Sequence, residues 1–206
     1  MNWLCIPGWA TTPEIFNDII PANIPFERFD FNFFNNKDFN TGQYIKTEGI
    51  ICFSQGSLTA LQIAQKSDIK RIIFIGGFTF FPGHDVKTGK LRKMKINLMI
   101  RGLKKNREKT LNDFYIEADL PLKAPTTFNV TNLIHGLELL RDCDMSHALT
   151  EIDSEIETIH AREDKIIPES LHKIQFKNAR HYRLKGNHGS FLSQPDELKQ
   201  ILTEIL

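Results

Sequence analysis

The chain has 206 residues, of which 41% are hydrophobic and 25% charged, and its formal net charge is +1. This length and composition indicate an ordinary globular protein with one sizeable core, hence a single domain over residues 1–206. No apolar run approaches the roughly 20 residues that a transmembrane helix needs, and the N-terminus has neither the basic start nor the apolar stretch of a secretory signal. We therefore expect a cytoplasmic protein with no membrane span.

Cysteine and histidine spacing predicts neither a metal nor a cofactor. Cys5, Cys52 and Cys143 are odd in number, far apart and without C-x-x-C spacing, so neither a disulfide framework nor a zinc site is indicated. No two histidines have the helical spacing of metal ligands.

Apolar segments with the character of strands alternate with helical ones along the chain. We predict strands at Trp3–Ile6, Phe29–Phe33, Ile50–Phe53, Ile72–Ile75, Ile156–Ala161 and Ala179–Leu184. We predict helices at Ile15–Ile20, Ser57–Lys66, Ile134–Cys143, Pro168–Lys173 and Pro195–Leu206. This order indicates an α/β fold with a mainly parallel sheet flanked by helices. Residues 78–130 lack a convincing strand and predict a helical cap inserted over one end of the sheet.

Positive charge is concentrated within that insertion. Between Lys87 and Lys109 there are ten lysine or arginine residues against one acid, Glu108. Leu91, Met94, Leu98 and Arg101 fall on one helical stripe, and Met94, Leu98 and Ile100 are placed to cover a pocket. The segment is therefore predicted to be an amphipathic helix, apolar on the side of the sheet and basic on the other side. Two interpretations stay open for the charge: a surface for an anionic partner, whether nucleic acid, phospholipid or acidic protein, or a solvated helix face.

Ser54 lies where the strand Ile50–Phe53 passes directly into a helix. A sharp strand-to-helix turn exposes a serine hydroxyl and places the next backbone N–H at a helix N-terminus, where negative charge is favoured. The motif departs from Gly-x-Ser-x-Gly, because Cys52 stands at the first glycine position. Taken alone, the serine has an equally good interpretation as a helix cap.

Two later strands end in groups that complete a catalytic triad. Glu163 and Asp164 follow Ile156–Ala161, and His188, flanked by Asn187 and Gly189, follows Ala179–Leu184. Ligands of such sheets bind beyond the carboxyl ends of the strands, and the chain order Ser, Asp, His is that of α/β hydrolases. We therefore predict Ser54 as nucleophile, His188 as base and Asp164 as the carboxylate that orients it. Asp164 as a turn residue and His188 as a loop histidine are the structural alternatives.

An oxyanion hole needs two backbone donors, usually one after the nucleophile and one after an early strand. Gln55 supplies the first, and Trp9, in the tight exit Pro7-Gly8-Trp9 of the first strand, supplies the second. The Trp9 indole would also face the substrate, or else pack into the core.

Four stretches give the chain a family resemblance. They are Pro7-Gly8-Trp9 with Phe16, Ser54-Gln55-Gly56, the run 136–144 (Gly-Leu-Glu-Leu-Leu-Arg-Asp-Cys-Asp), and 164–168 with 188–195. Together they make the chain resemble an α/β hydrolase, and more closely the pimeloyl-[acyl-carrier-protein] methyl ester esterases of biotin synthesis. It departs from them in lacking their N-terminal hairpin, which trims one sheet edge, in Pro7 for the customary histidine, and in a shortened cap.

The resemblance implies hydrolysis of the methyl ester of a pimeloyl chain carried by acyl carrier protein. The strongly acidic carrier would dock on the basic cap; the residues implied are Lys93, Lys95, Arg101, Lys104, Lys105, Arg107 and Lys109. The acyl channel would be lined by Phe114, Tyr115, Ile116, Glu117 and Ala118, with Trp9 and His188 at its inner end. We expect a monomer that binds no nucleic acid.

Other functions stay open. A general short-chain carboxylesterase or thioesterase would use the same triad. A non-catalytic binding protein on this scaffold is a further alternative, although none of the three triad residues is missing.

Overall fold

A six-stranded sheet forms the centre of the molecule. In the computed structural model, which describes residues 2–40 and 47–206, the strands are β1 (Trp3–Ile6), β2 (Phe26–Arg28), β3 (Gly49–Phe53), β4 (Arg71–Ile75), β5 (Glu155–Ala161) and β6 (Arg180–Leu184). Their order in the sheet is β2-β1-β3-β4-β5-β6, and all five pairings are parallel. The predicted α/β class with a mainly parallel sheet is confirmed.

The central strands are buried because helices cover the sheet. Every residue of β1 and β3 is buried, as are four of the five in β4, which explains why these strands read as continuous apolar runs. The helices are α1 (Gly56–Ala64), α2 (Val86–Lys105), α3 (Arg107–Ala118), α4 (Val130–Asp142), α5 (Glu169–Gln175) and α6 (Asp196–Ile205). No described helix is long and apolar enough to cross a membrane.

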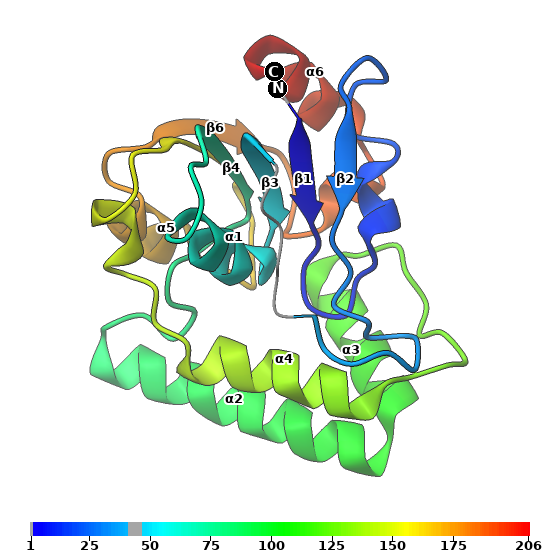
Figure 1. Ribbon diagram of the computed structural model, residues 1–206. Helices are drawn as coiled ribbons and strands as arrows, with labels where there is room; N and C mark the ends of the chain where they lie inside the picture. Colours follow the sequence, from blue (N-terminus) through cyan, green and yellow to red (C-terminus); the bar gives the residue numbers. More distant parts are fainter. Residues whose placement is uncertain (1, 41–46) are drawn as a thin grey trace.

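Three helices form a layer beyond the carboxyl ends of the strands. Figure 1 shows β1 and β2 pointing toward this layer, with α2 and α4 side by side and α3 next to them. Contacts of α2 with both α3 and α4 hold the layer together. Side chains of this layer therefore face the edge of the sheet where ligands of parallel α/β folds bind.

The predicted strand Phe29–Phe33 is wrong, because the strand lies earlier, at Phe26–Arg28. Phe29, Phe31 and Phe33 are fully buried or nearly so, which produced the alternating pattern. Phe29 still donates its backbone N–H to the Cys5 carbonyl oxygen at 3.0 Å. The strands end at Arg28 and Ile6, however, so Phe31 and Phe33 lie beyond the sheet. The three phenylalanine rings pack on one another instead, with centroids 4.8 and 5.3 Å apart along the series.

The predicted helix Ile15–Ile20 is also wrong, since the structure has only one 3₁₀ turn there, Pro13–Phe16. The apolar pattern correctly predicted burial, because the four residues Ile15, Phe16, Ile19 and Ile20 are all buried. Pro21 follows immediately and limits the segment to successive turns.

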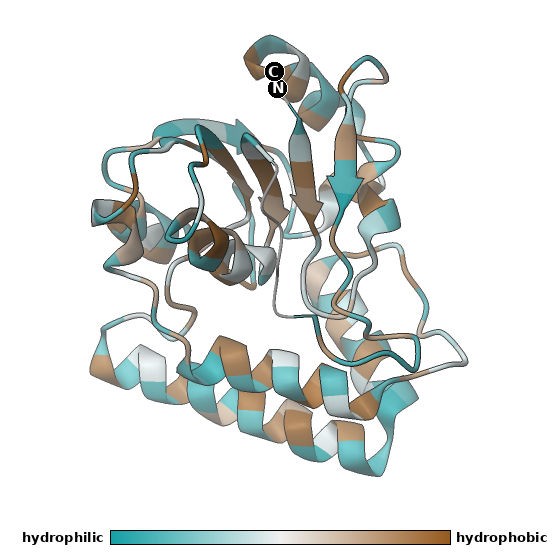
Figure 2. Cartoon of the chain, in the orientation of Figure 1, coloured by the Kyte–Doolittle hydropathy of each residue, from teal (hydrophilic) through white to brown (hydrophobic). Residues whose placement is uncertain are grey.

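The orientation predicted for the basic helix is reversed in α2. Met94 and Leu98 were expected to cover a pocket together with Ile100, yet they are 52% and 63% exposed, and Leu91 on the same stripe is 56% exposed. Ile100 is half-buried. The buried residues of α2 are Gly89, Ile96 and Leu103. Figure 2 shows hydrophobic and hydrophilic residues interleaved along this helix. Because apolar residues lie on more than one side of α2, its periodicity did not determine which side faces inward.

We predict that Gly56→Ala destabilises the fold. A Cβ atom at Gly56 would lie 2.5 Å from the Ile6 carbonyl oxygen and 2.7 Å from that of Pro7. Both are backbone atoms, so α1 must move away from β1, at a cost of about 1–3 kcal/mol. Urea unfolding measures the loss, with Lys66→Ala at the exposed end of the same helix as control. An unchanged free energy of unfolding for Gly56→Ala would contradict the close packing described here.

Candidate active site

Ser54 occupies a strained turn between β3 and α1. Its φ angle is +51°, in the left-handed region that residues other than glycine rarely adopt. The turn is closed by the Ser57 hydroxyl, which donates to the Ser54 carbonyl oxygen at 2.6 Å. Gly56, packed against the exit of β1, allows α1 to begin at once. This geometry holds the Ser54 hydroxyl at the carboxyl edge of the sheet.

Ser54, His188 and Asp164 form a continuous hydrogen-bonded chain. His188 Nε2 lies 2.9 Å from Ser54 Oγ, and His188 Nδ1 lies 2.7 Å from Asp164 Oδ2. The side chains of His188 and Asp164 are 1% and 0% exposed. The structure thus brings together three residues that are up to 134 positions apart in sequence.

The surroundings of Asp164 favour its ionised form. Burial by itself would raise the pKa of this carboxyl group, but His188 and the backbone N–H of Ile167 hold the pKa below its usual value. An ionised Asp164 accepts a hydrogen bond from Nδ1–H of His188, which leaves Nε2 free to accept the proton of Ser54. The arrangement is therefore that of a nucleophile, a general base and an orienting carboxylate.

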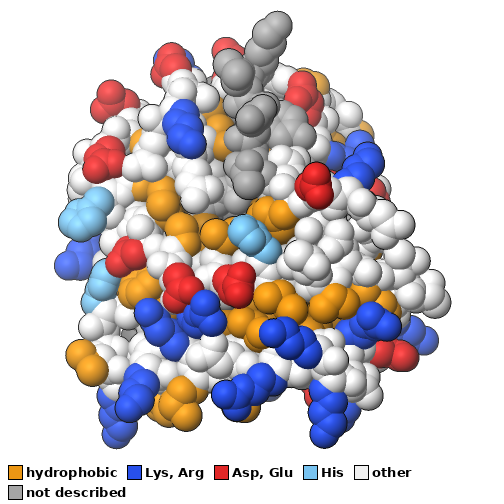
Figure 3. Space-filling view, turned by 60° about the horizontal axis from the view of Figure 1, so that its bottom comes forward, with side chains coloured by type: hydrophobic (Ala, Val, Ile, Leu, Met, Phe, Trp, Pro, Cys, Tyr) orange, Lys and Arg blue, Asp and Glu red, His pale blue; other side chains and the backbone are white. Residues whose placement is uncertain are grey.

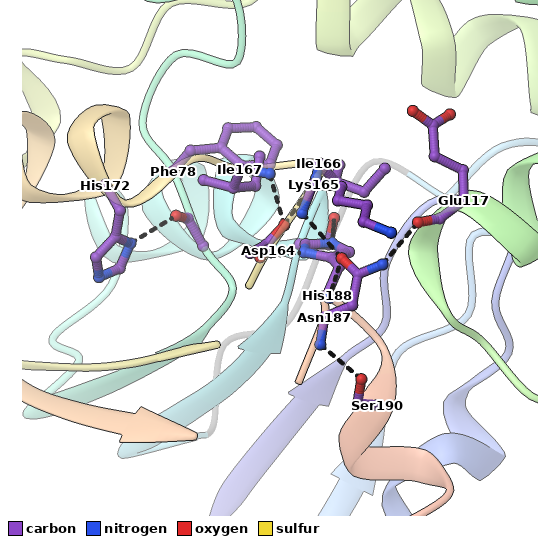
Figure 4. A network of polar contacts seen from close by, with 12 residues as sticks. Phe78, Glu117, Asp164, Lys165, Ile166, Ile167, His172, Asn187, His188 and Ser190 are labelled. Carbon is purple, nitrogen blue, oxygen red and sulfur yellow. Dashed lines mark hydrogen bonds and ion pairs between the residues drawn. The ribbon is translucent and has the colours of Figure 1, made fainter. Parts of the chain in front are cut away.

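Asn187 connects the loops that carry the histidine and the aspartate. Its Oδ1 accepts hydrogen bonds from the backbone N–H groups of His188, at 2.8 Å, and of Lys165, at 2.9 Å. Its Nδ2 donates to the Glu117 carbonyl oxygen at 2.8 Å, which ties both loops to α3. Figure 4 shows Asn187 at the centre of these contacts. Sequence reasoning did not identify this role, which depends on three segments meeting in space.

The expected oxyanion donors Trp9 and Gln55 lie beside Ser54. A Cβ atom added to Gly8 would be 3.1 Å from Ser54 Cβ, so the loop after β1 borders the serine. Trp9 and Gln55 are 2% and 1% exposed. Within residues 2–40 and 47–206, neither backbone N–H donates to another residue. Two buried donors without a partner can stabilise an oxyanion.

A cavity of about 120 Å³ opens next to Ser54. Its apolar lining comes from the loops after β1, β4 and β5 and from the helices α2, α3 and α4. The residues are Trp9, Phe81, Ile96, Met99, Phe114, Leu137, Leu140, Ile166 and Pro168. The Trp9 indole contacts Phe114 edge-to-face, with centroids 4.8 Å apart, and donates to the Leu133 carbonyl oxygen at 2.9 Å.

Of the five α3 residues expected along the acyl channel, Phe114 alone lines this cavity. Tyr115 is buried and donates its hydroxyl to the Ala10 carbonyl oxygen at 2.8 Å. Ile116 is 79% exposed. Glu117 forms an ion pair with Lys95, and Ala118 accepts a hydrogen bond from the N–H of Gly189. One face of α3 meets the cavity, so five consecutive residues could not all do so.

The basic residues expected to meet a carrier protein have different surroundings. Arg101, Lys104, Lys105, Arg107 and Lys109 are exposed. Lys109 pairs with Asp113, and Lys95 pairs with Glu117 while also lining the cavity. Lys93 is half-buried, with its Nζ 5.8 Å from the Phe80 ring centroid.

Cys52 has a structural role beside the site. Burial raises the pKa of its thiol far above the usual range, so the group stays protonated and unreactive. Its Sγ lies 3.6 Å from the Ile73 carbonyl oxygen on β4. The second glycine of the motif, Gly56, is present and packs against the exit of β1.

Two histidines that the sequence did not single out are buried behind the site. His160 on β5 and His172 on α5 are 4% and 2% exposed, and their rings stack with centroids 4.3 Å apart. Both nitrogens of His160 and Nε2 of His172 are buried without a hydrogen-bond partner. Among the described residues, no cluster of His, Cys, Asp and Glu has the arrangement of a metal site.

Comparison with solved structures identifies the fold. An esterase from Exiguobacterium antarcticum is similar with a TM-score of 0.79 and 16% identity, over 100% of this chain and 91% of that chain. A bromoperoxidase from Bacillus anthracis has a TM-score of 0.79 and 14% identity, over 98% and 90%. A thermophilic esterase from Thermogutta terrifontis, with malate bound, has a TM-score of 0.77 and 11% identity, over 100% and 89%. The protein has the α/β-hydrolase fold. No family model and no curated protein sequence matches the chain.

We predict that His172 makes the fold sensitive to acid. Burial, with a smaller effect of His160, lowers the pKa of His172 to about 4, whereas a histidine in the unfolded chain has a pKa of about 6.5. Between these values the unfolded chain binds more protons than the folded one. Stability therefore falls as the pH drops from about 6.5 to 4, by about 3 kcal/mol for this group.

Urea unfolding at pH 7 and pH 4.5 measures this effect. The difference between the two pH values should shrink in His172→Phe and stay as in wild type in the control His147→Phe, since His147 is exposed. The same pH difference in His172→Phe as in wild type would contradict a buried neutral His172.

Proposed function

We propose that the protein is a serine carboxylesterase. The observation that carries this proposal is the hydrogen-bonded chain Asp164–His188–Ser54, whose serine has a φ angle of +51° beside an apolar cavity. A serine hydroxyl is a weak nucleophile until a positioned base accepts its proton. Esterases of the same fold support the proposal by analogy.

The reaction follows from the positions of these groups. Ser54 Oγ attacks the ester carbonyl carbon while its proton passes to His188 Nε2, and the carbonyl oxygen becomes an oxyanion at the N–H groups of Trp9 and Gln55. The carbon–oxygen bond to the alcohol breaks, and His188 returns the proton to the leaving alcohol. Water, deprotonated by His188, then attacks the acyl-enzyme, and the proton passes back to Ser54 as the acid leaves.

As the specific substrate we propose the methyl ester of pimeloyl-acyl-carrier-protein, which would yield pimeloyl-acyl-carrier-protein and methanol in biotin synthesis. Support comes from the sequence resemblance and from the exposed cations of α2 and α3. Figure 3 shows Lys and Arg side chains spread over the face that carries these helices, with hydrophobic side chains between them. Such a face attracts a strongly acidic carrier protein.

The remaining parts of the proposal concern organisation and alternatives. We propose a cytoplasmic monomer of one domain, in which residues 78–130, continued by α4, act as a lid over Ser54. The alternative is a general short-chain carboxylesterase or thioesterase, which the small cavity favours. A non-catalytic binding protein is disfavoured because all three triad groups are present and in contact.

The first test replaces the nucleophile. Ser54→Ala should lower kcat for simple aryl esters by at least about 10³-fold, because triad members act as a unit. Its melting temperature should remain close to that of wild type. Ser193→Ala, at an exposed serine, is the control. Hydrolysis by Ser54→Ala at the wild-type rate would refute Ser54 as nucleophile.

The second test concerns the carrier. The triple variant Arg101→Glu, Lys104→Glu, Lys105→Glu should raise KM for the carrier-bound ester about 10-fold or more by reversing the charge that attracts the acidic partner. KM for small neutral esters should stay within about twofold, and Lys199→Glu on α6 is the control. An unchanged KM for the carrier-bound ester argues for the general esterase.

A further inference from the structure

The cavity beside Ser54 combines an apolar lining with cations and no acid. Arg92, Lys95 and Lys165 contribute to its wall, and none of its other lining residues is Asp or Glu. Arg92 is half-buried there, whereas Lys95 and Lys165 are exposed. Partial removal of a cation from water costs free energy unless an anion compensates it. The distribution of charge inside the cavity therefore bears on the chemistry of the substrate.

Arg92 is the most constrained of the three cations. It is half-buried on α2, and its Nη1 donates to the Pro82 carbonyl oxygen at 2.8 Å. Burial lowers the pKa of Arg92, which Asp85 offsets in part. No carboxylate among the described residues lies within ion-pair distance of Arg92. The Asp85 carboxylate is instead engaged by the N–H and hydroxyl of Thr88.

Lys165 is held at the cavity by its position next to Asp164. Its backbone N–H donates to Asn187 Oδ1, which fixes the residue in the loop that carries the triad carboxylate. Figure 4 shows Lys165 in the same loop as Asp164, and its side chain is exposed. Lys165 forms no ion pair with a described residue, whereas Lys95 is neutralised by Glu117. Two uncompensated cations, Arg92 and Lys165, thus line the same cavity as Ser54.

We propose that the substrate of Ser54 carries an anionic group, a carboxylate or a phosphate, that binds to Arg92 and Lys165. A half ester of a dicarboxylic acid has the required parts: an ester for Ser54, an apolar chain for the cavity wall and a free carboxylate for the cations. A guanidinium binds carboxylate and phosphate through paired N–H donors, and a lysine ammonium adds a point charge. This proposal rests on ester hydrolysis at Ser54, and a free half ester as substrate corresponds to the general carboxylesterase, the alternative to the carrier-bound ester.

Matched esters test the proposal. The probes are 4-nitrophenyl hydrogen adipate, 4-nitrophenyl 6-phosphonooxyhexanoate and the uncharged 4-nitrophenyl hexanoate, which share a six-carbon acyl chain. Wild type should have a kcat/KM at least about 10-fold higher for an anionic ester than for the hexanoate. The better of the two anionic esters identifies the charged group.

Substitutions identify the residues responsible for the preference for anionic over neutral esters. The ratio of kcat/KM for anionic over neutral ester should fall about 10-fold or more in Arg92→Met and in Lys165→Met. Arg92→Lys, which keeps the charge, should retain part of the preference. Lys90→Met, the same loss of charge at an exposed position of α2, should keep the wild-type ratio. Equal kcat/KM values for all three esters in wild type would overturn the proposal while leaving the esterase intact.

A binding measurement tests the anion site in a protein that lacks the nucleophile, and so independently of ester hydrolysis. Calorimetric titration of Ser54→Ala protein with adipate or with 6-phosphonooxyhexanoate should show binding that the added Arg92→Met substitution weakens about 10-fold. If Ser54→Ala protein binds these anions but wild-type protein hydrolyses none of the esters, the anion site is supported and the esterase is refuted. If wild-type protein hydrolyses the esters but Ser54→Ala protein binds neither anion, the anion site is refuted. Binding that Arg92→Met leaves unchanged would refute it as well.

Discussion

The strained backbone of Ser54 is the constraint on which the site depends. A left-handed residue between β3 and α1 turns the chain at once from strand to helix, so the hydroxyl reaches the edge of the sheet and Gln55 N–H is left without an intrahelical partner. The strain persists because α1 is packed tightly against the exit of β1 through Gly56, with no room for a Cβ atom. The same packing brings the loop of Gly8 and Trp9 beside Ser54.

The positive charges around the layer of α2, α3 and α4 fall into two populations, one at the outer surface and one in the wall of the cavity. Arg101, Lys104 and Lys105 face solvent, where they can attract an acidic partner, and salt weakens this attraction by screening. Arg92 and Lys165 line the cavity instead. Arg92 is half-buried, so an anion in the cavity would interact with it more strongly than in bulk water. The +1 net charge of the chain conceals both populations. In our proposals, the outer charges act in association with a partner and the inner ones in selection of the substrate.

The sequence predictions of strands and site residues were most accurate where a local pattern is compatible with one structure only. The buried parallel strands are continuous apolar runs, and chain order brought Ser54, Asp164 and His188 together as candidates because parallel strands end at the same edge. The prediction failed at Phe29–Phe33, where alternating buried phenylalanines just beyond the end of β2 resemble a strand. It failed again for α2, because Leu91, Met94 and Leu98 formed as plausible an apolar stripe as Ile96 and Leu103. Arg92 lines the cavity because α2 turns the side that carries Ile96 and Leu103 toward the interior. No pattern in the sequence could therefore distinguish Arg92 from its basic neighbours. The role of Asn187 and the stacked pair His160 and His172 likewise arise from contacts between segments distant in sequence.

The most direct test of the central claim, that His188 activates Ser54, is covalent labelling with a fluorophosphonate followed by intact-mass measurement and peptide mapping. Wild-type protein should gain the mass of one phosphonyl group, located on Ser54, because a phosphonyl centre captures an activated serine in the geometry of the ester reaction. The same treatment of His188→Ala should give a much slower gain, since the base is missing. A wild-type protein that stays unlabelled, or that is labelled on another serine, would contradict the claim.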